Sequence, residues 1–188
     1  GLRRFSEDLD FSLLGPDCRF SISPYLQNLE RDLRIYGYQI EILDRSNDKS
    51  PVKNAFIKDE SLGKVLTLKF PALTSRPKKL RIKLEVDTQP PTGAIIENSY
   101  HTFPLPMVVT MYDLPSLCAG KVHALLCRPY VKGRDWYDFL WYINRQVTPN
   151  LALLHSALNQ MGPWQGQVIS LGSSWLEKEL RKKIVDIN

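Results

Sequence analysis

The sequence has few cysteines and no long hydrophobic run. Its cysteines, Cys18, Cys118 and Cys127, are three among 188 residues, and no pair has the CxxC spacing of a zinc site. An odd, sparse cysteine count is typical of a reducing compartment rather than of a disulfide-bonded secreted domain. No apolar run approaches the roughly 18 residues of a membrane helix, and no signal peptide is recognisable. We therefore expect a cytoplasmic protein with no zinc site and no membrane partner.

Several motifs of nucleotide-binding and hydrolytic enzymes are also missing. The sequence contains no GxSxG elbow, no Walker A loop and no GxGxxG fingerprint. Its histidines, His101, His123 and His155, lack the paired spacing of a metal site, so we interpret all of them as structural. These absences leave serine-hydrolase, P-loop and Rossmann interpretations without support.

The composition is that of a globular protein with a mild basic excess. Hydrophobic residues make up 43% and charged residues 24% of the chain, which are ordinary values. A net charge of +5, from 25 Lys and Arg against 20 Asp and Glu, permits a polyanionic partner such as RNA or a nucleotide without requiring one. A chain of this length can bury one good core with a small helical appendage.

Hydrophobic periodicity changes along the chain from a strand-like to a helix-like repeat. This order predicts the α+β class, with a mixed sheet followed by a helical bundle, and a division into domains 1–112 and 113–188. The predicted elements are strands at 5–13, 38–43, 54–59, 64–70, 80–87 and 107–112, a helix between Ser23 and Gly37, and helices at 114–127, 134–145, 150–161 and 173–187.

Two aspartates stand two residues apart in the first predicted strand. In a strand, Asp8 and Asp10 share one face, while the alternating residues Leu9, Phe11 and Leu13 are expected to enter the core. Adjacent carboxylates repel each other, and Mg²⁺ prefers such oxygen ligands together with substrate phosphates. The pair therefore indicates metal-assisted phosphate chemistry. The alternative is a solvated acidic face on a short strand.

A third carboxylate lies on the most regular predicted strand. Leu80, Ile82, Leu84 and Val86 form one face of residues 80–87, and Glu85 lies on the other with Arg81, Lys83 and Asp87. A carboxylate there, aimed at the same metal as Asp8 and Asp10, would complete a two-metal site for in-line displacement. The alternative is again a solvated polar face.

Charged residues also occur in the predicted helices. Lys121 lies in an otherwise apolar segment, where it could pair with a nucleotide phosphate or extend its ammonium into water. Asp135 is interpreted as a helix N-cap, with Asp138 three residues later near the positive end of the helix dipole. Either aspartate could also be catalytic, because a capping carboxylate can still take part in chemistry.

The last predicted helix is amphipathic and basic. Leu176, Leu180 and Ile184 lie on one face, and four cations surround them: Lys178, Arg181, Lys182 and Lys183. This pattern is typical of a packed helix with a solvated basic side. Contact with RNA is the alternative.

Four segments occur in a recognisable order: residues 4–12 (RFSEDLDFS), 82–86 (IKLEV), Lys121, and 133–140 (GRDWYDFL). The first closely resembles the R-F-S-x-D-[LI]-D-F signature of the AbiEii/AbiGii toxin family of nucleotidyltransferases. The second is similar to the strand that carries that family's third carboxylate. The last two resemble its later KxxxL and RDxxDL elements. The first and last motifs are the more specific ones.

The resemblance implies a polymerase-β-like nucleotidyltransferase core and a C-terminal helical bundle. It also implies Mg²⁺-dependent transfer of a nucleotidyl group from an NTP to an acceptor, tRNA or another RNA, by a toxin with a cognate antitoxin in a toxin–antitoxin or abortive-infection system. The residue roles that it implies are metal binding by Asp8, Asp10 and Glu85, activation of the attacking hydroxyl by Glu85, nucleotide binding by Ser6 and Lys121, and a late acidic element at Asp135 and Asp138.

One family element is missing from the sequence given. The family carries a glycine-rich loop about ten residues before its two aspartates, and seven residues precede Asp8 here. Such a loop cradles phosphates with backbone N–H groups. We therefore expect that N-terminal sequence is missing, or that this is a divergent member. The alternative functions are a catalytically inactive RNA- or protein-binding module on the same fold and an unrelated metal-dependent phosphohydrolase.

Overall fold

The computed structural model describes residues 8–37, 39–44, 61–69, 79–103, 105–130 and 132–185. The chain divides into two compact units, an N-terminal unit (Arg3–Pro90) and a C-terminal unit (Pro91–Asn188). The described residues form five helices and two small sheets, which agrees with the predicted α+β class. The predicted domain boundary after residue 112 stays a prediction.

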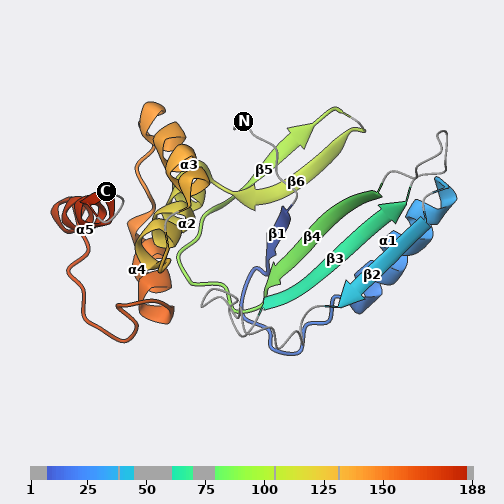
Figure 1. Ribbon diagram of the computed structural model, residues 1–188, viewed down its shortest axis with the longest axis horizontal. Helices are drawn as coiled ribbons and strands as arrows, with labels where there is room; N and C mark the ends of the chain where they lie inside the picture. The colour runs from blue at the N-terminus through green and yellow to red at the C-terminus, as the bar shows by residue number, and fades with distance from the viewer. Residues whose placement is uncertain are drawn as a thin grey trace. The chain divides into compact units, whose positions relative to one another are not determined.

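A four-stranded mixed sheet forms most of the N-terminal unit (Figure 1). The strand order is β1-β4-β3-β2, and β1 runs parallel to β4 whereas the other pairs are antiparallel. The strands are β1 (Asp8–Ser12), β2 (Gln39–Asp44), β3 (Ser61–Lys69) and β4 (Lys79–Asp87). Each falls within or overlaps a predicted strand, while the strand predicted at 54–59 lies outside the described residues.

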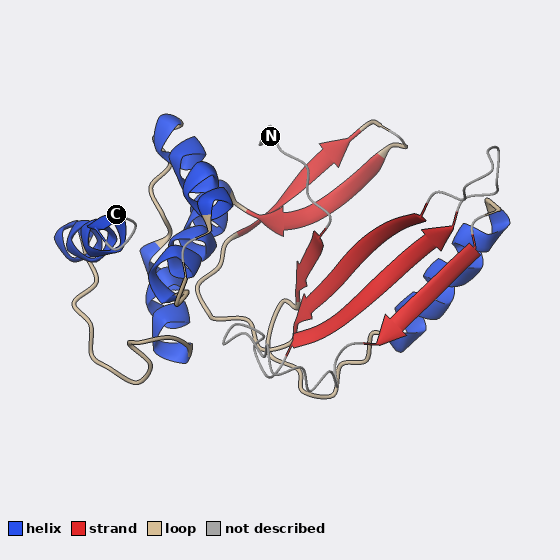
Figure 2. Cartoon of the chain, viewed as in Figure 1, coloured by secondary structure: helices blue, strands red, loops and turns tan. Residues whose placement is uncertain are grey.

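Helix α1 (Ser23–Ile35) lies along one face of this sheet (Figure 2). Its buried Leu26 and the preceding Ile22 pack against Leu84 and Val86 of β4. The alternation predicted for β4 is confirmed at these two positions, because every second residue faces the helix.

The ends of α1 differ in how well they were predicted. The N-cap is Ile22 rather than Ser23, so Ser23 and Pro24 both belong to the first turn. At the other end, Gly37 has a φ of +82°, a left-handed conformation that glycine adopts without a Cβ clash and that commonly ends a helix. The predicted stop at Gly37 is therefore confirmed.

The expectation that Leu9 and Phe11 enter the core is wrong. Their side chains are 48% and 55% exposed, although the register pairs them with the buried Leu84 and Val86. The physical reason is that β1 is a five-residue edge strand, while the buried face of α1 packs on β4. Leu13, just after β1, does pack against the core.

The C-terminal unit consists of a hairpin followed by helices. Strands β5 (Ile96–His101) and β6 (Met107–Tyr112) pair antiparallel, and β5 is a strand that the sequence pattern did not predict. The helices are α2 (Leu114–Cys127), α3 (Gly133–Asn144), α4 (Leu151–Gln160) and α5 (Ser173–Val185). All four agree with predicted helices to within about two residues, which is the usual uncertainty of helix ends.

Packing of α2 against α4 forms the core of the C-terminal unit. Val122 and Leu126 of α2, with Leu154 and Leu158 of α4, are completely buried. Side-chain caps fix where both helices begin, since Asp113 accepts from the Ser116 amide at 2.9 Å and Asn150 from the Leu153 amide at 3.1 Å. His123 Nε2 lies 3.3 Å from the Met161 carbonyl, a structural contact of the kind expected for that histidine.

Helix α5 is less buried than the sequence pattern predicted. It has no fully buried residue, and Ile184 is 48% exposed. It packs on α2, and Trp175 meets Trp164 edge-on at 5.3 Å between ring centroids. In the part of the chain that the structure describes, no helix is long and apolar enough to cross a membrane.

Candidate functional site

Three of the predicted site residues share one face of the N-terminal sheet. The parallel register places Asp8 beside Lys83 and Asp10 beside Glu85. All of these alternate with residues on the α1 side, so they lie on the opposite face. Lys83 Nζ is 2.5 Å from Glu85 Oε1. The predicted grouping of Asp8, Asp10 and Glu85 on neighbouring strands therefore agrees with the register, and a cation accompanies it.

Asp10 shows the electrostatic cost of this grouping. Partial burial raises its pKa above the ordinary value of 3.8, and the charge of Glu85, a hydrogen bond with Glu85 and the charge of Asp8 raise the pKa further. The nearby Lys83 ammonium acts in the opposite direction. Burial and like-charged neighbours both disfavour the ionised form of this carboxyl group, and a bound divalent cation would favour that form.

The donor chemistry of this face fits Mg²⁺. Asp8, Asp10 and Glu85 offer only carboxylate oxygens, and Mg²⁺ commonly takes one or two carboxylates together with phosphate oxygens and water. Across the described ranges, however, no group of three or more His, Cys, Asp or Glu side chains is arranged so that it could hold a metal ion. The pair Asp10 and Glu85, directly opposite each other in the register, is thus the part of the predicted metal site that the structure brings together.

A second charged group lies inside the C-terminal unit, between α2 and α3. Lys121 Nζ is 3.2 Å from Asp135 Oδ1 and 2.9 Å from Asp138 Oδ2. Arg128, the C-cap residue of α2, forms an ion pair with the other oxygen of Asp135. We call these four residues the Lys121 cluster. Two cations and two carboxylates make its formal charge zero.

Both carboxylates of the Lys121 cluster are deeply buried. Asp135 is 2% and Asp138 0% exposed, whereas the side chains of Lys121 and Arg128 keep 23% and 21%. Buried carboxylates need such partners, because an unpaired buried charge is strongly unfavourable. The interpretation of Lys121 as a lysine whose ammonium simply reaches water is therefore wrong.

The predicted capping role of Asp135 also needs correction. The N-cap of α3 is Lys132, which makes no side-chain capping bond, and Asp135 stands in the first turn. Its carboxylate accepts from Lys121 and Arg128 of α2 rather than from an amide of α3. Proximity to the positive helix end still favours its charge.

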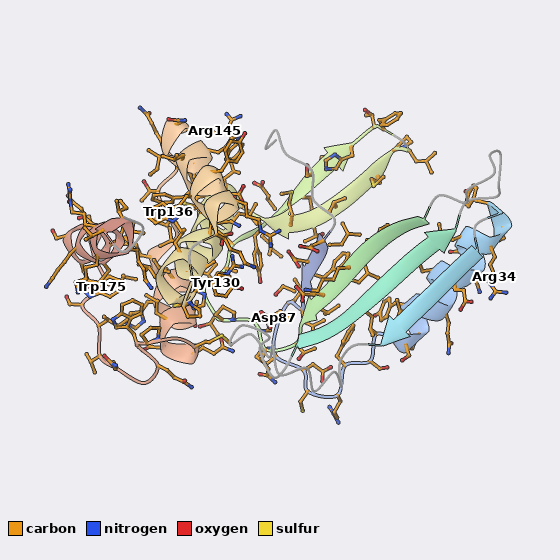
Figure 3. All side chains as sticks on the ribbon, in the orientation of Figure 1. Arg34, Asp87, Tyr130, Trp136, Arg145 and Trp175 are labelled. Carbon is orange, nitrogen blue, oxygen red and sulfur yellow. The ribbon has the colours of Figure 1, made fainter. Side chains whose placement is uncertain are left out.

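A small pocket opens beside the Lys121 cluster, among α2, α3 and α5. It has a volume of about 240 Å³ and carries three cationic side chains, two aromatic rings and Asp135 on its walls. We call it the α2–α3–α5 pocket. Its polar and aromatic lining is Arg128, Tyr130, Lys132, Asp135, Trp136 and Lys183. Figure 3 labels the two aromatic residues, Tyr130 and Trp136.

Sequence reasoning missed most of this lining. Lys121, Leu125 and Arg128 follow a spacing of four and three residues, which places them on one side of a helix. That spacing could have connected Arg128 with Lys121. Nothing in the sequence could have shown that Lys183, 55 residues beyond Arg128, donates to the Arg128 carbonyl at 3.4 Å.

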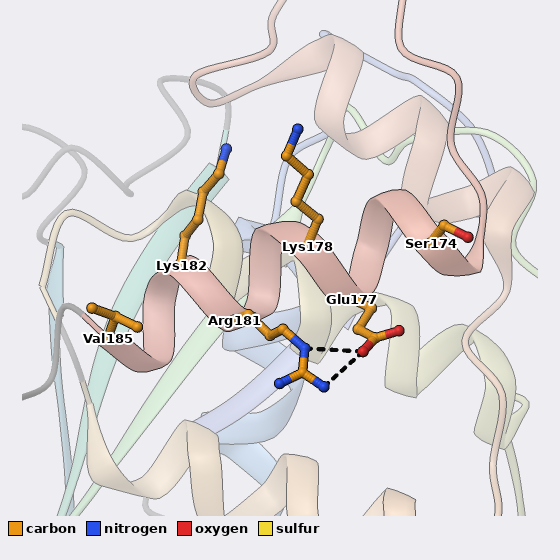
Figure 4. A pocket seen from close by; sticks show the side chains of 6 residues that line it. All are labelled: Ser174, Glu177, Lys178, Arg181, Lys182 and Val185. Carbon is orange, nitrogen blue, oxygen red and sulfur yellow. Dashed lines mark hydrogen bonds and ion pairs between the residues drawn. The ribbon is translucent and has the colours of Figure 1, made fainter.

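A broader hollow of about 540 Å³ runs along α5. In Figure 4, Lys178 and Lys182 extend to one side of the helix, and Arg181 lies on another side with Glu177. Nε and Nη2 of Arg181 donate to Glu177 Oε1 at 2.9 and 2.8 Å. Lys182 also pairs with Glu179 at 2.7 Å. This agrees with the solvated basic side predicted for the helix. Of the remaining predicted site residues, Ser6 lies outside the described residues.

The sequence of the chain matches a known protein family. No curated protein and no solved structure matches the chain significantly. The sequence-family model described as "Nucleotidyl transferase AbiEii toxin, Type IV TA system" matches residues 1–187. The match covers the carboxylate face, the Lys121 cluster and the α2–α3–α5 pocket alike. The chain therefore belongs to the AbiEii family of nucleotidyl transferase toxins of type IV toxin–antitoxin systems.

Proposed function

We propose that this chain transfers a nucleotidyl group from an NTP to an RNA acceptor, such as tRNA, in a Mg²⁺-dependent reaction. Membership of the AbiEii family supports nucleotidyl transfer and a toxin with a cognate antitoxin. The observation that carries the proposal for this particular chain is the pairing of Asp10 with Glu85 on one sheet face, with Asp8 alongside. We also propose that the N-terminal unit is a polymerase-β-like core, as its mixed sheet with a covering helix permits.

Asp8, Asp10 and Glu85 would hold the metal. When bound, Mg²⁺ would neutralise triphosphate charge and favour an attacking oxygen, which are its general contributions to phosphoryl-type chemistry. The chain's own contribution is to hold carboxylates on adjacent parallel strands, where the hydrogen bonds of the sheet fix their spacing. A site built in advance in this way spends little free energy on reorganisation during the reaction.

Lys83 has a secondary role in this proposal. Its ammonium is 2.5 Å from Glu85 Oε1, so it partly offsets the repulsion between the carboxylates of Glu85 and Asp10. An ionised Glu85 can accept a proton from an attacking hydroxyl group, which is the role that the family resemblance assigns to it.

The C-terminal unit would contribute Lys121 to nucleotide binding. Asp135 and Asp138 hold its ammonium at 3.2 and 2.9 Å, and an ammonium group has three donors, so one donor can be directed at a phosphate. In this proposal the two aspartates position Lys121, and Ser6 binds nucleotide through the first motif.

The test is labelling of RNA with radioactive NTPs by the full chain in Mg²⁺. Asp10→Asn is expected to reduce labelling by at least a hundredfold, because it removes one of the paired carboxylates. Asp32→Asn is the matched control in the same unit, since Asp32 is exposed on α1 and forms an ion pair with Arg31 at 3.3 Å. Full labelling by the Asp10→Asn variant would contradict the proposal.

A binding module without catalysis is the second candidate. One observation favours it: within the described residues, no three potential ligands are already arranged around a common point. This candidate predicts salt-sensitive RNA binding and no incorporation of nucleotide at any Mg²⁺ concentration. RNA labelling that requires Asp10 would eliminate it.

A further inference from the structure

We propose that the α2–α3–α5 pocket binds a single nucleotide unit, with its base against Tyr130 or Trp136 and its phosphate at Lys132 and Lys183. The proposal deepens the proposed function and rests on it for the choice of a nucleotide as ligand. The charge, the rings and the size of the pocket are independent of the carboxylate face, because every lining residue belongs to the C-terminal unit.

The charge of the pocket favours an anion. Lys132 and Lys183 line it together with Arg128, and Asp135 is its acidic residue. Asp135 would repel a phosphate if it were alone, but Lys121 and Arg128 already bind both of its oxygens. The cations that remain in excess are therefore the two lysines.

Both lysines keep donors for a ligand. Lys183 Nζ contacts the Arg128 carbonyl at 3.4 Å, near the limit of a hydrogen bond, and Lys132 Nζ lies 5.3 Å from the centre of the Tyr130 ring. Among the described residues, neither lysine forms an ion pair with a carboxylate. An ammonium group has three donors, so most of this capacity is available to a phosphate.

The alternative explanation is that both lysines have structural roles only. Lys183 would then only stabilise the C-terminal end of α2, where a cation is favourable, and Lys132 would only cover Tyr130. That explanation accounts for each lysine separately. It does not account for a pocket that gathers both lysines and two rings around an already neutralised carboxylate.

The rings favour a base as the other part of the ligand. Tyr130 is 41% exposed, and Trp136 is half-buried and braced edge-on by Phe139 at 6.1 Å. Base stacking on aromatic side chains is the common sequence-tolerant contact to single nucleotides. The volume of about 240 Å³ lies below the roughly 300–1,000 Å³ of pockets for drug-sized ligands, so the pocket would enclose part of one nucleotide and has no room for a second.

Two sources could supply this nucleotide: a free NTP or one residue of the RNA acceptor. Fluorescence anisotropy of the full chain in EDTA separates them, with a fluorescent ATP analogue in one arm and a short labelled single-stranded oligoribonucleotide in the other. EDTA removes any metal contribution of Asp8, Asp10 and Glu85. We expect saturable binding in at least one arm, and the tighter arm identifies the source.

Two variants, one double and one single, test the assignment of the pocket. Lys132→Ala with Lys183→Ala is expected to weaken the tighter probe at least tenfold, and Tyr130→Ala about tenfold, as loss of one stacked base does. Lys178→Ala is the matched control, since Lys178 is an exposed lysine on the same helix as Lys183. Lys183→Arg keeps the positive charge at this position. It should retain most of the binding if the double alanine variant loses affinity only because charge is lost.

Unchanged binding by the double lysine variant, or no saturable binding in either arm, overturns the proposal. A melting temperature within a few degrees of wild type confirms that the variants fold. Failure of the proposed function has a different signature: binding in EDTA persists and depends on Lys132 and Lys183, but no RNA is labelled in Mg²⁺.

Discussion

At the scale of single residues, Lys121 is the side chain whose loss should matter most for stability. It is the ammonium between two carboxylates that are 2% and 0% exposed. Replacement by methionine keeps the stem and removes the charge, so Asp138 loses a buried partner. Breaking a buried pair in this way costs about 3–5 kcal/mol.

We therefore predict that Lys121→Met lowers the free energy of unfolding by about 3 kcal/mol, measured by urea denaturation. Lys178→Met, on an exposed side of α5, should change it by less than about 0.5 kcal/mol. Equal effects of the two substitutions would show that the Lys121 cluster does not form.

Loss of the Asp10 charge should stabilise the protein, whereas loss of the Lys121 charge should destabilise it. The surroundings of Asp10 disfavour its ionised form. Its pKa is raised above 3.8, so the folded state binds the proton more tightly than the unfolded state does. The resulting stability is present below about pH 4 and is lost as the pH rises through the raised pKa.

Asp10→Asn should therefore stabilise the protein at pH 7 in EDTA, by no more than about 1 kcal/mol because the burial of Asp10 is only partial and water screens its charge. Thermal melting measures the change. Mg²⁺ should raise the melting temperature of the wild type more than that of the variant. A lower melting temperature for the variant in EDTA would contradict the repulsion described above.

The cysteines give a third prediction at this scale. Burial raises the pKa of Cys118 to about 11 and that of Cys127 to about 12, from 9.0, and the nearby Lys183 only partly offsets the burial at Cys127. Cys18 is exposed. At pH 8 an alkylating reagent should label Cys18 readily and the other two only after denaturation, because the thiolate is the nucleophile.

The same shifts make stability depend on alkaline pH. Folded thiols with raised pKa values hold their protons to higher pH than unfolded thiols do. The stability is therefore complete below about pH 9 and falls as the pH rises towards about 12.

In the alkylation experiment, mass spectrometry counts the labelled cysteines in the native state. More than one rapidly labelled thiol would show that α2 is less well packed than described.

At the scale of elements, the turn after α4 depends on a glycine. Gly162 has a φ of +106°, and a Cβ there would lie 2.6 Å from Cys127 Sγ at the end of α2. Gly162→Ala should destabilise the protein by about 1–3 kcal/mol, through backbone strain and overpacking.

The double variant Gly162→Ala with Cys127→Ala separates these two causes. It removes the sulfur that an added methyl group would meet, so it should recover the steric part and leave the strain. Urea denaturation of both single variants and the double variant gives the coupling energy. If the changes in unfolding free energy of the two single variants simply add up in the double variant, the close approach of Gly162 to Cys127 is contradicted.

Sequence periodicity predicted elements well where one face is buried and poorly where it is not. Strand β4 alternates because α1 covers every second residue, and Leu84 and Val86 are 6% and 5% exposed. The apolar alternation of β1 gave the right face but the wrong burial, because an edge strand has a neighbour on one side only. Strand β5 carries few apolar residues in alternation, so its pairing with β6 had no recognisable local signal.

The candidate sites show the same limit. The i, i+2 spacing of Asp8 and Asp10 predicted their shared face, and the position of Glu85 in β4 predicted that it would lie on the same side. The ion pairs of Lys121 with Asp135 and Asp138 join two helices, and the contact of Lys183 with Arg128 joins residues 55 apart. Such contacts follow from tertiary packing, which local patterns do not encode.

At the scale of the whole molecule, the two units have different chemistry. The N-terminal unit presents paired carboxylates that suit a cation, and the C-terminal unit presents a pocket of cations and rings that suits a nucleotide. Family membership across residues 1–187 includes both units. A nucleotidyltransferase needs both kinds of site, because it must neutralise a triphosphate and hold a base or a sugar in position.

The most direct measurement is the mass of the RNA after incubation with the full chain, Mg²⁺ and an NTP, with the pyrophosphate released measured in parallel. Nucleotidyl transfer predicts RNA heavier by whole nucleotidyl units, one pyrophosphate for each unit, and loss of both signals in the Asp10→Asn variant. RNA of unchanged mass, accompanied by release of inorganic phosphate or by no release at all, would contradict the account.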